Sequence, residues 1–392
     1  MSDNALLPSK SPKVALVSGC NGISGHAIVE HLVQQPDSEW SKIVITSRRP
    51  PPDSWADPRV EFVAVDFLAP KEKAVEALKP LCGDVTHAYF TSYVHNDDLT
   101  KLTETNAPLF RNFMDVVESI CPKLDRVCLQ TGGKYYGVHL GPTKQPVNED
   151  MPRYDDKGLN FYYPQEDYLC EAQERRNKWS YNIIRPVGII GFTPRANGMS
   201  MALSFAVYLI INAELGVAST PFLGSEFLLD SVDDVSHAPS LADMTVWATT
   251  HEHTRNEVFN HASGDLVVWR HFWPQLAEYF GVKIEKPTAL NTSVAEWARD
   301  KRAVWHRLVQ RHGGSPDAFD WCTWAVFDWV NTRDWLIVAS IAKARRMGWA
   351  RFDGAEDMWV RTFASFEDAG VLPRASVVRA AAAAAAGGAG VN

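Results

Sequence analysis

The sequence predicts an α/β protein with a doubly wound parallel sheet, followed by a C-terminal region that is mainly helical. In the first half, short apolar runs of strand length alternate with segments whose apolar residues recur at helical spacing. From Met199 onward the pattern becomes helices with short strands, and tryptophans become frequent. We therefore expect a sheet domain over 1–198 (its core from about residue 13), and a second region over 199–375 whose short strands interleave with that core. An Ala/Gly-rich tail over 376–392 is expected to be disordered.

Composition and charge narrow the functional classes. The chain has 392 residues and a formal net charge of -8, which argues against a nucleic-acid partner because phosphate binding requires a basic surface. Its six cysteines form no CxxC pair and are typical of reduced thiols, so we expect a cytoplasmic protein. The apolar run that begins at Met201 contains Asn212 and Glu214, which favours a buried helix over a membrane span. No metal site is expected.

Each element of the first half follows from its own apolar pattern. Residues 14–19 form a continuous apolar run that ends at a glycine, as a buried strand does. The next segment places Ile28, Val29, Leu32 and Val33 on one helical face. The same patterns predict further strands at 42–47, 60–66, 86–92, 126–132 and 181–190, and helices at 73–81 and 109–120.

A glycine-rich turn joins the first strand to the first helix and indicates a dinucleotide site of Rossmann type. Gly19, Gly22 and Gly25 have the spacing GxxGxxG. The first glycine permits the tight turn, the second lets the backbone approach a pyrophosphate, and the third allows close helix–strand packing. The helix N-terminus then offers free N–H groups to the phosphates. The alternative, a turn with only a structural role, is weakened by its position at the first strand–helix junction.

The ends of the second and third strands indicate which dinucleotide binds. An NAD site normally has an acidic residue at the end of the second strand, but this chain has Arg48 and Arg49. Two guanidinium groups suit the 2′-phosphate of NADP, although a solvated pair at a loop start remains the alternative. Asp66 is placed to accept from the adenine amino group and Phe67 to pack on the ring, unless Asp66 only ends the strand.

The residues around Tyr162 resemble a reductase site that lacks its usual lysine. Short-chain dehydrogenases place a Lys four residues after the catalytic Tyr, but Tyr162 and Tyr163 are followed at that distance by Glu166 and Asp167. A lysine is available elsewhere: Lys134 follows the fifth strand, which neighbours the helix of Tyr162 in such a sheet. The sequence therefore predicts a Tyr–Lys pair assembled from separate elements.

Two of these segments, "QTGGKYYG" and "NFYYPQEDYL", resemble signature motifs of the progesterone 5β-reductase and iridoid synthase family, an atypical extended branch of the short-chain dehydrogenases. The resemblance continues through "THAYFTS", "IIRPVGIIGFTP" and "NEVFNHASGD", and runs from about Lys13 to beyond Trp359. It implies an NADPH-dependent reductase of conjugated enones or enals with a small hydrophobic carbonyl substrate. A homodimer is compatible with this reading.

The resemblance also assigns roles to individual residues. Tyr162 and Lys134 match the catalytic pair, and both also lie at the cofactor. The remaining cofactor contacts that it implies are Asn21, Gly22 and Ile23 at the phosphate turn, Arg48 and Arg49, Asp66 and Phe67, Ser92 and Tyr93 after the fourth strand, Gln130 below the nicotinamide, and Ile189 at the carboxamide. The loop after Lys134 and the segment "RANGMS" depart from the relatives, so the family's substrate is not carried over.

Three functions remain open from the sequence. The first is conjugate reduction of an enone or enal, in which a phenol stabilises the developing enolate. The second is ketone reduction or alcohol oxidation, because a Tyr–Lys pair serves both. The third is an NADP-sensing regulator without turnover, against which the retention of both residues argues.

The tryptophan-rich second half has two interpretations. Eight of the 14 tryptophans lie between Trp297 and Trp359. They either line an apolar substrate pocket or form the core of the helical extension, and the large area that each buries favours the core.

Overall fold

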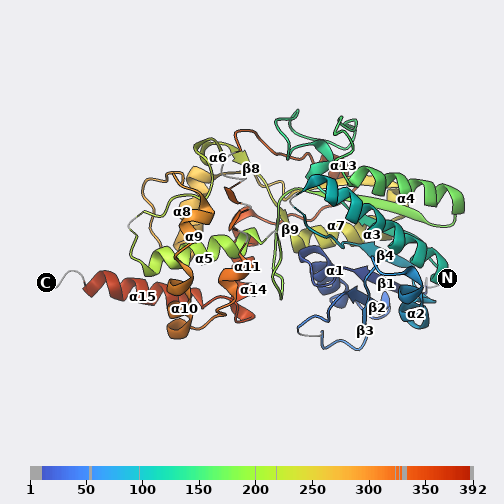
Figure 1. Cartoon of the computed structure of the whole chain (residues 1–392), viewed down its shortest axis with the longest axis horizontal. Helices are drawn as coiled ribbons and strands as arrows, with labels where there is room; N and C mark the ends of the chain where they lie inside the picture. Colours follow the sequence, from blue (N-terminus) through green and yellow to red (C-terminus); the bar gives the residue numbers. More distant parts are fainter. Residues whose placement is uncertain are drawn as a thin grey trace, which may run out of the picture.

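The protein has two halves that lie side by side, a sheet flanked by helices and a group of helices at the C-terminal end (Figure 1). The computed structural model describes residues 11–52, 55–96, 98–198, 200–217, 219–322, 324–325, 327–328 and 333–388. Trp329, one of the tryptophans considered above, lies outside the described residues.

The main sheet has seven strands, and every neighbouring pair is parallel. Its order is β10-β6-β5-β4-β1-β2-β3, which is the doubly wound Rossmann order with one strand added at the edge. The predicted fold class is confirmed. The strands are β1 (Lys13–Ser18), β2 (Trp40–Ser47), β3 (Val60–Ala64), β4 (His87–Phe90), β5 (Arg126–Gln130), β6 (Ser180–Pro186) and β10 (Glu257–His261).

The predicted strand over 181–190 is divided in two. β6 ends at Pro186, whose ring nitrogen has no N–H for the next rung of the ladder. A two-residue strand, β7 (Ile189–Ile190), then pairs with β9 (Ser236–His237) outside the main sheet. The chain later returns to the sheet as β10, so the second region supplies one of the strands of the core.

Helices cover both faces of the sheet. On one face lie α1 (Ile23–Val33) and α7 (Ala238–Thr250), which share a hydrophobic cluster with β1 and β2. The other face is covered by α2 (Lys71–Cys82), α3 (Leu99–Ile120) and α4 (Tyr162–Arg176), whose apolar residues pack in a second cluster. This arrangement buries the strands on both sides, as a parallel sheet requires.

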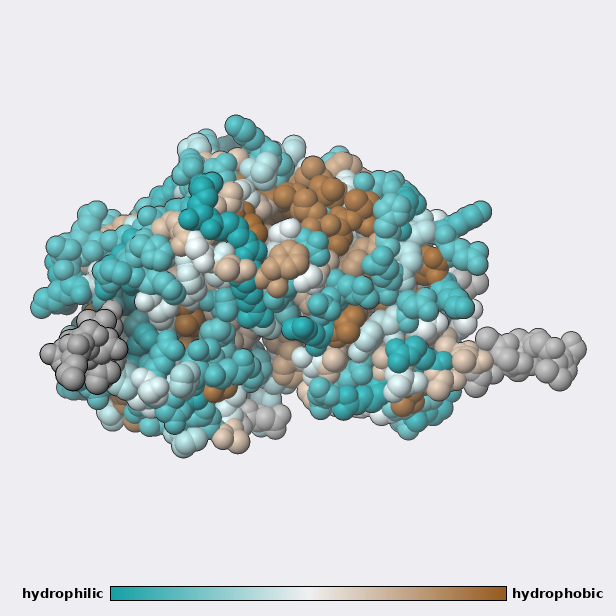
Figure 2. All heavy atoms as spheres, turned by 180° about the vertical axis from the view of Figure 1, so that it is seen from behind, coloured by the Kyte–Doolittle hydropathy of each residue, from teal (hydrophilic) through white to brown (hydrophobic). Residues whose placement is uncertain are grey.

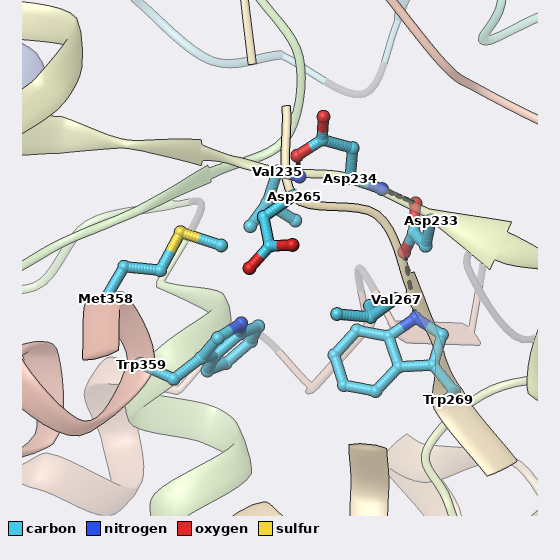
Figure 3. Close-up of a pocket in the computed structure, with 8 residues that line it drawn as sticks. All are labelled: Asp233, Asp234, Val235, Asp265, Val267, Trp269, Met358 and Trp359. Carbon is cyan, nitrogen blue, oxygen red and sulfur yellow. Dashed lines mark hydrogen bonds between the residues drawn. The ribbon is translucent and has the colours of Figure 1, made fainter. Parts of the chain in front are cut away.

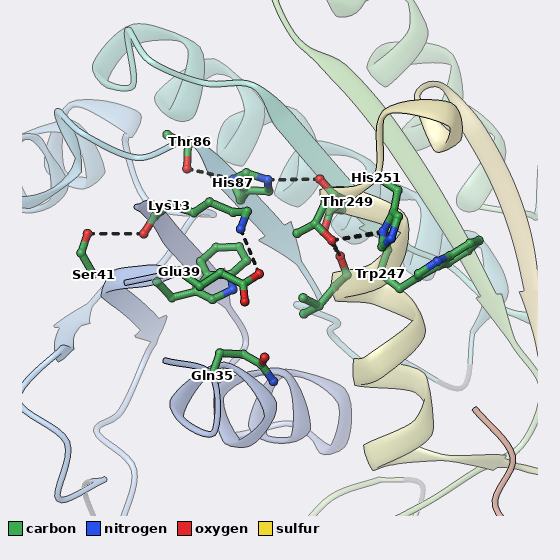
Figure 4. Close-up of polar contacts among 12 residues, drawn as sticks. Lys13, Gln35, Glu39, Ser41, Thr86, His87, Trp247, Thr249 and His251 are labelled. Carbon is green, nitrogen blue, oxygen red and sulfur yellow. Dashed lines mark hydrogen bonds and ion pairs between the residues drawn. The ribbon is translucent and has the colours of Figure 1, made fainter. Parts of the chain in front are cut away.

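Polar contacts fix α7 against the strands (Figure 4). Nε2 of His87 lies 3.1 Å from the carbonyl oxygen of Thr249, and its Nδ1 lies 2.8 Å from the hydroxyl of Thr86. The hydroxyl of Tyr89 lies 3.0 Å from that of Thr249. Burial lowers the pKa of His87 to about 3, so the imidazole is neutral in the folded protein.

We expect His87 to make the protein sensitive to acid. The unfolded chain takes up a proton at the ordinary histidine pKa of about 6.5, whereas the folded protein takes it up near pH 3. The stability that this shift supplies is therefore complete above pH 6.5 and is lost as the pH falls toward 3. When the pH is lowered from 7 to 5, the free energy of unfolding of His87→Gln, measured in urea, should fall by about 2 kcal/mol less than that of the wild type. His306→Gln, an exposed histidine on α10 (Arg302–His312), is the control; equal losses in wild type and His87→Gln would contradict the assignment.

The C-terminal half is organised around α5 (Met201–Glu214), the predicted buried helix. Among the described residues, no helix has both the length and the apolar composition needed to cross a membrane. Around α5 lie α6 (Glu226–Asp230), α8 (Trp269–Tyr279), α9 (Val294–Ala298), α10, α11 (Ala318–Trp321), α14 (Ala355–Asp368) and α15 (Ala375–Gly388), with the strand pair β8 (Val232–Asp233) and β11 (Val267–Val268). The short helices η2 (Glu252–Thr254) and α13 (Ala342–Arg346) lie on the sheet half.

The core interpretation of the tryptophans is confirmed for those that are buried. Trp305, Trp349 and Trp359 are each at most 2% exposed. Trp305 and Trp359 belong to the core of the C-terminal half, together with Trp269 and Trp273.

Most of the alanine-rich end of the chain, for which disorder is expected from the sequence, is drawn as a helix. Helix α15 continues from Ala375 to Gly388, and Val378 is buried in the core of the C-terminal half. The physical reason is that alanine has the highest helix propensity, so a low-complexity alanine run becomes helical once its first turn is anchored. Residues 389–392 lie outside the described part of the chain.

The six cysteines are free, as predicted, and five of them are buried. On the face drawn in Figure 2, hydrophobic side chains gather near the upper middle, between the two halves of the molecule. A region of this kind suits an apolar ligand.

Candidate active site

The glycine turn between β1 and α1 is built by close contacts that exclude larger residues. Gly19 has a φ of +77°, which favours glycine. A Cβ on Gly25 would lie 2.2 Å from the carbonyl oxygen of Gly19, so only glycine fits there. Gly22 precedes the first turn of α1, and this helix start has no side-chain cap. The backbone N–H groups of that first turn therefore remain available to an anion. The geometry fits the pyrophosphate of a dinucleotide.

Two amide side chains tie this turn to neighbouring strands and keep a free acceptor each. Asn21 donates from Nδ2 to the hydroxyl of Ser47 at 2.8 Å and to the carbonyl of Arg49 at 2.7 Å. Gln130 donates from Nε2 to the hydroxyl of Ser24 at 2.7 Å. The oxygen atoms Oδ1 of Asn21 and Oε1 of Gln130 are buried without a protein partner. Buried acceptors of this kind suit a polar ligand.

The adenosine end of the predicted site is open. Arg48 and Arg49 are exposed after β2, and Asp66 is exposed after β3, where its carboxylate accepts the amide of Leu68 at 2.9 Å. Phe67, expected beside the adenine, directs its ring away from this open surface. The ring is 4% exposed and packs edge-on against Phe113 at 5.3 Å, because the residue after Asp66 turns back into the hydrophobic core.

Tyr162 and Lys134 lie on adjoining segments. Lys134 belongs to η1 (Gly133–Tyr136), directly after β5, and Tyr162 is the first residue of α4. A Cβ on Gly132 would lie 3.2 Å from the Tyr162 hydroxyl, so the phenol points at the turn that carries the lysine. No hydrogen bond joins the Lys134 ammonium to the phenol within the described residues.

The side chain of Asn160 connects the two segments. Its Nδ2 donates to the carbonyl oxygen of Lys134 at 2.8 Å, and its Oδ1 accepts the amide of Tyr162 at 3.2 Å. Asn160 is 3% exposed, so these bonds are shielded from water. Sequence reasoning missed this residue, although its place two residues before Tyr162 is typical of a side chain that caps a helix start.

Glu166 explains why the usual lysine is absent from α4. Its carboxylate accepts from Nη2 of Arg185 at 3.0 Å and from Nε at 3.3 Å, and both residues are buried. The Arg185 guanidinium also stacks on Tyr135, 3.2 Å from the ring centroid. The position four residues after Tyr162 therefore holds the acidic half of a buried ion pair. Arg185 was not predicted, because its partner is distant in sequence.

Burial sets the protonation of the candidate catalytic groups. Burial, with smaller contributions from Tyr93 and Glu166, raises the pKa of Tyr162 above its ordinary value. The phenol is therefore protonated at neutral pH and can donate a hydrogen bond. Burial lowers the pKa of Lys134, and burial and the nearby Lys134 lower that of His139 to about 4.

The surroundings of Tyr162 are apolar. A hydrophobic cluster beside it contains Tyr135, Val138 and Val187, and Ile337 packs against that cluster. The indole of Trp335 donates to the carbonyl of Val138 at 2.9 Å, which brings the second region to the loop after Lys134.

Of the other predicted contacts, Tyr93 lies beside the segment of Tyr162, and Ser92 lies beside the glycine turn. Tyr93 stacks on Phe161 at 5.7 Å, one residue before Tyr162. The amide of Ser92 passes within 3.0 Å of where a Cβ on Gly19 would lie, and Ile189 begins β7.

A small cavity elsewhere in the fold has a structural explanation (Figure 3). It is lined by carboxylates and indole rings at the β8–β11 junction and has room for about one water molecule. Asp233 accepts from the indole of Trp269 at 2.9 Å, and Asp265 accepts the amide of Ala355 at 2.7 Å, at the start of α14. Asp234 accepts the hydroxyl of Ser263. These carboxylates join segments of the C-terminal region to one another, from β8 and the residues after β10 to α8 and the start of α14.

Comparisons with known proteins agree with this geometry. The chain belongs to the family of PRISE-like Rossmann-fold domains, whose model matches residues 15–372. This confirms the resemblance to progesterone 5β-reductases and iridoid synthases. The chain is therefore an oxidoreductase of the short-chain dehydrogenase/reductase superfamily.

Individual relatives place the chain more closely. It is 42% identical to a short chain dehydrogenase of Penicillium aethiopicum, over 93% of this chain and 100% of that protein. It is 33% identical to an (S)-8-oxocitronellyl enol synthase of Nepeta racemosa, over 78% of this chain and 79% of that protein. The crystal structure of the Bordetella bronchiseptica enzyme WbmH in complex with NAD+ shares the fold, with a TM-score of 0.62 at 17% identity, covering 92% of this chain and 100% of that one.

Proposed function

We propose that this protein is an NADPH-dependent reductase that adds hydride to the β-carbon of a conjugated enone or enal. The observation that carries the proposal is the protonated Tyr162 phenol, aimed at the turn of Lys134 and bordered by an apolar cluster. The enol synthase relative, which is named for an enol product, supports the same chemistry. The substrate is a small hydrophobic carbonyl compound. A cytoplasmic location and a homodimer belong to the same proposal.

When bound, NADPH would supply the hydride that adds to the β-carbon of the substrate. The electron pair of the double bond moves toward the carbonyl, and negative charge develops on the carbonyl oxygen. Tyr162 donates a hydrogen bond to that oxygen, an interaction worth ~3 kcal/mol when the donor is well placed. Lys134 would hold the cofactor ribose, and Asn160 keeps the two segments in register. Solvent then protonates the α-carbon.

The second candidate is a carbonyl reductase, because the same phenol can deliver a proton to an alkoxide. Incubation with NADPH and a cyclic enone, followed by product analysis, separates the two: a saturated ketone supports the proposal, and an allylic alcohol as the sole product supports the alternative. If the protein consumes no NADPH with either this enone or an enal, the result would favour a non-catalytic NADP sensor.

We expect NADPH to bind at least tenfold more tightly than NADH, a difference of about 1.4 kcal/mol. The reason is the exposed Arg48–Arg49 pair, with no acidic residue at the end of β2. Titration of both cofactors by fluorescence measures the preference. The double variant Arg48→Ala/Arg49→Ala should lose it while retaining NADH affinity; an unchanged preference would refute the assignment.

A further inference from the structure

Arg195 extends toward the same end of the cofactor site from a different part of the chain. It lies in the segment 191–200, which joins β7 to α5. Its Nη2 donates to the carbonyl oxygen of Pro50 at 3.3 Å. Pro50 directly follows Arg48 and Arg49. The carbonyl of Arg49 is in turn held by Asn21 of the glycine turn at 2.7 Å. The three arginines therefore belong to two segments that meet beside the start of α1.

The segment that carries Arg195 is packed against α1. A Cβ on Gly191 would lie 3.2 Å from the Ile23 side chain, so the backbone passes very close to the first turn of the helix. The ring of Phe192 packs edge-on against His26 at 5.4 Å. The hydroxyl of Thr193 donates to the carbonyl of Arg195 at 2.8 Å and fixes the turn. Arg195 is thus presented from a fixed backbone.

The charge at this place is unbalanced. Across the described ranges, none of Arg48, Arg49 and Arg195 pairs with a carboxylate, in a protein whose 47 acidic residues outnumber its 39 Lys and Arg. The Nε of Arg195 is buried without a hydrogen-bond partner. Guanidinium groups with free donors at one location favour an anion with several oxygen atoms.

We propose that Arg195 is a third arginine of the site that binds the cofactor's 2′-phosphate, an inference that rests on the proposed NADPH dependence. The free Nε–H and the Nη groups of its fork bind phosphate oxygens, while the contact with Pro50 keeps the fork beside Arg48 and Arg49.

The test is titration of the full-length protein with NADPH, NADH and 2′,5′-ADP, for the wild type, Arg195→Ala and Arg195→Lys. We expect Arg195→Ala to lower the affinity for NADPH and for 2′,5′-ADP about tenfold or more, and the affinity for NADH less than twofold. Arg195→Lys should recover part of the lost affinity. Arg307→Ala, an exposed arginine on α10, is the control and should leave all three affinities unchanged. Circular dichroism checks that each variant is folded.

The outcomes separate this inference from the proposed function. Equal weakening of NADPH and NADH, or no weakening of either, in Arg195→Ala would overturn the role at the 2′-phosphate. If Arg48→Ala/Arg49→Ala still loses the NADPH preference in that case, the cofactor assignment stands without Arg195. A wild-type protein that binds both cofactors equally overturns both.

Discussion

Tyr162→Phe should lower the rate of hydride transfer by ~10²–10³, the effect of removing one donor to a developing oxyanion. The affinity for NADPH should barely change, because the lost hydroxyl acts on the substrate oxygen. Tyr162 is half-buried, and its phenol is protonated at neutral pH and can donate to that oxygen. Single-turnover measurements at saturating NADPH report this step directly.

Residual turnover distinguishes the two enzymatic functions. Hydride addition to a β-carbon needs no proton on oxygen in the same step, so Tyr162→Phe should remain slowly active as an ene-reductase. A carbonyl reductase must form a hydroxyl group, so the same substitution should lower its activity more. Tyr168→Phe, on the same helix but bonded to Asp115, is the matched control. A Tyr162→Phe variant as fast as the control would remove Tyr162 from the mechanism.

Glu166→Lys, which restores the lysine spacing of other short-chain dehydrogenases, should destabilise the protein by at least about 3 kcal/mol. The substitution replaces the partner of Arg185 with a second cation in a buried place, where both native residues are at most 5% exposed. Stacking of Arg185 on Tyr135, next to Lys134, would be disturbed as well. Urea unfolding measures the loss.

The control for this prediction is Glu171→Lys, an exposed position on the same helix. It should change the free energy of unfolding by less than about 0.5 kcal/mol. If Glu166→Lys were as stable as the control and more active than the wild type, the acidic residue at this position would have no structural role, and the pairing of Tyr162 with Lys134 would lose its support.

Local patterns in the sequence were sufficient for strands β1 to β6, although β6 ends earlier than predicted, and for the glycine turn and the free cysteines. Gly19 and Gly25 were predictable because their roles depend on backbone geometry that a strand–turn–helix sequence already defines. The separate origin of Tyr162 and Lys134 was also predictable, since β5 and α4 neighbour each other in any sheet of this order. What packs around those elements was harder to infer.

The features that the sequence does not indicate depend on long-range packing. Whether Phe67 faces a ligand or the core depends on Phe113, which belongs to a helix far along the chain. Arg185 and Trp335 come from segments whose local sequence patterns do not indicate that they lie at the site. The low complexity of the alanine-rich end of α15 does not reveal that Val378 packs into the core of the C-terminal half.

The position of the transferred hydride tests the proposed chemistry most directly. NADPH deuterated at the transferable position is incubated with the protein and either a cyclic enone or an enal, and NMR locates the label in the product. Conjugate reduction places deuterium on the β-carbon and leaves the carbonyl intact. Deuterium found only on the carbonyl carbon would contradict the account and establish the protein as a carbonyl reductase.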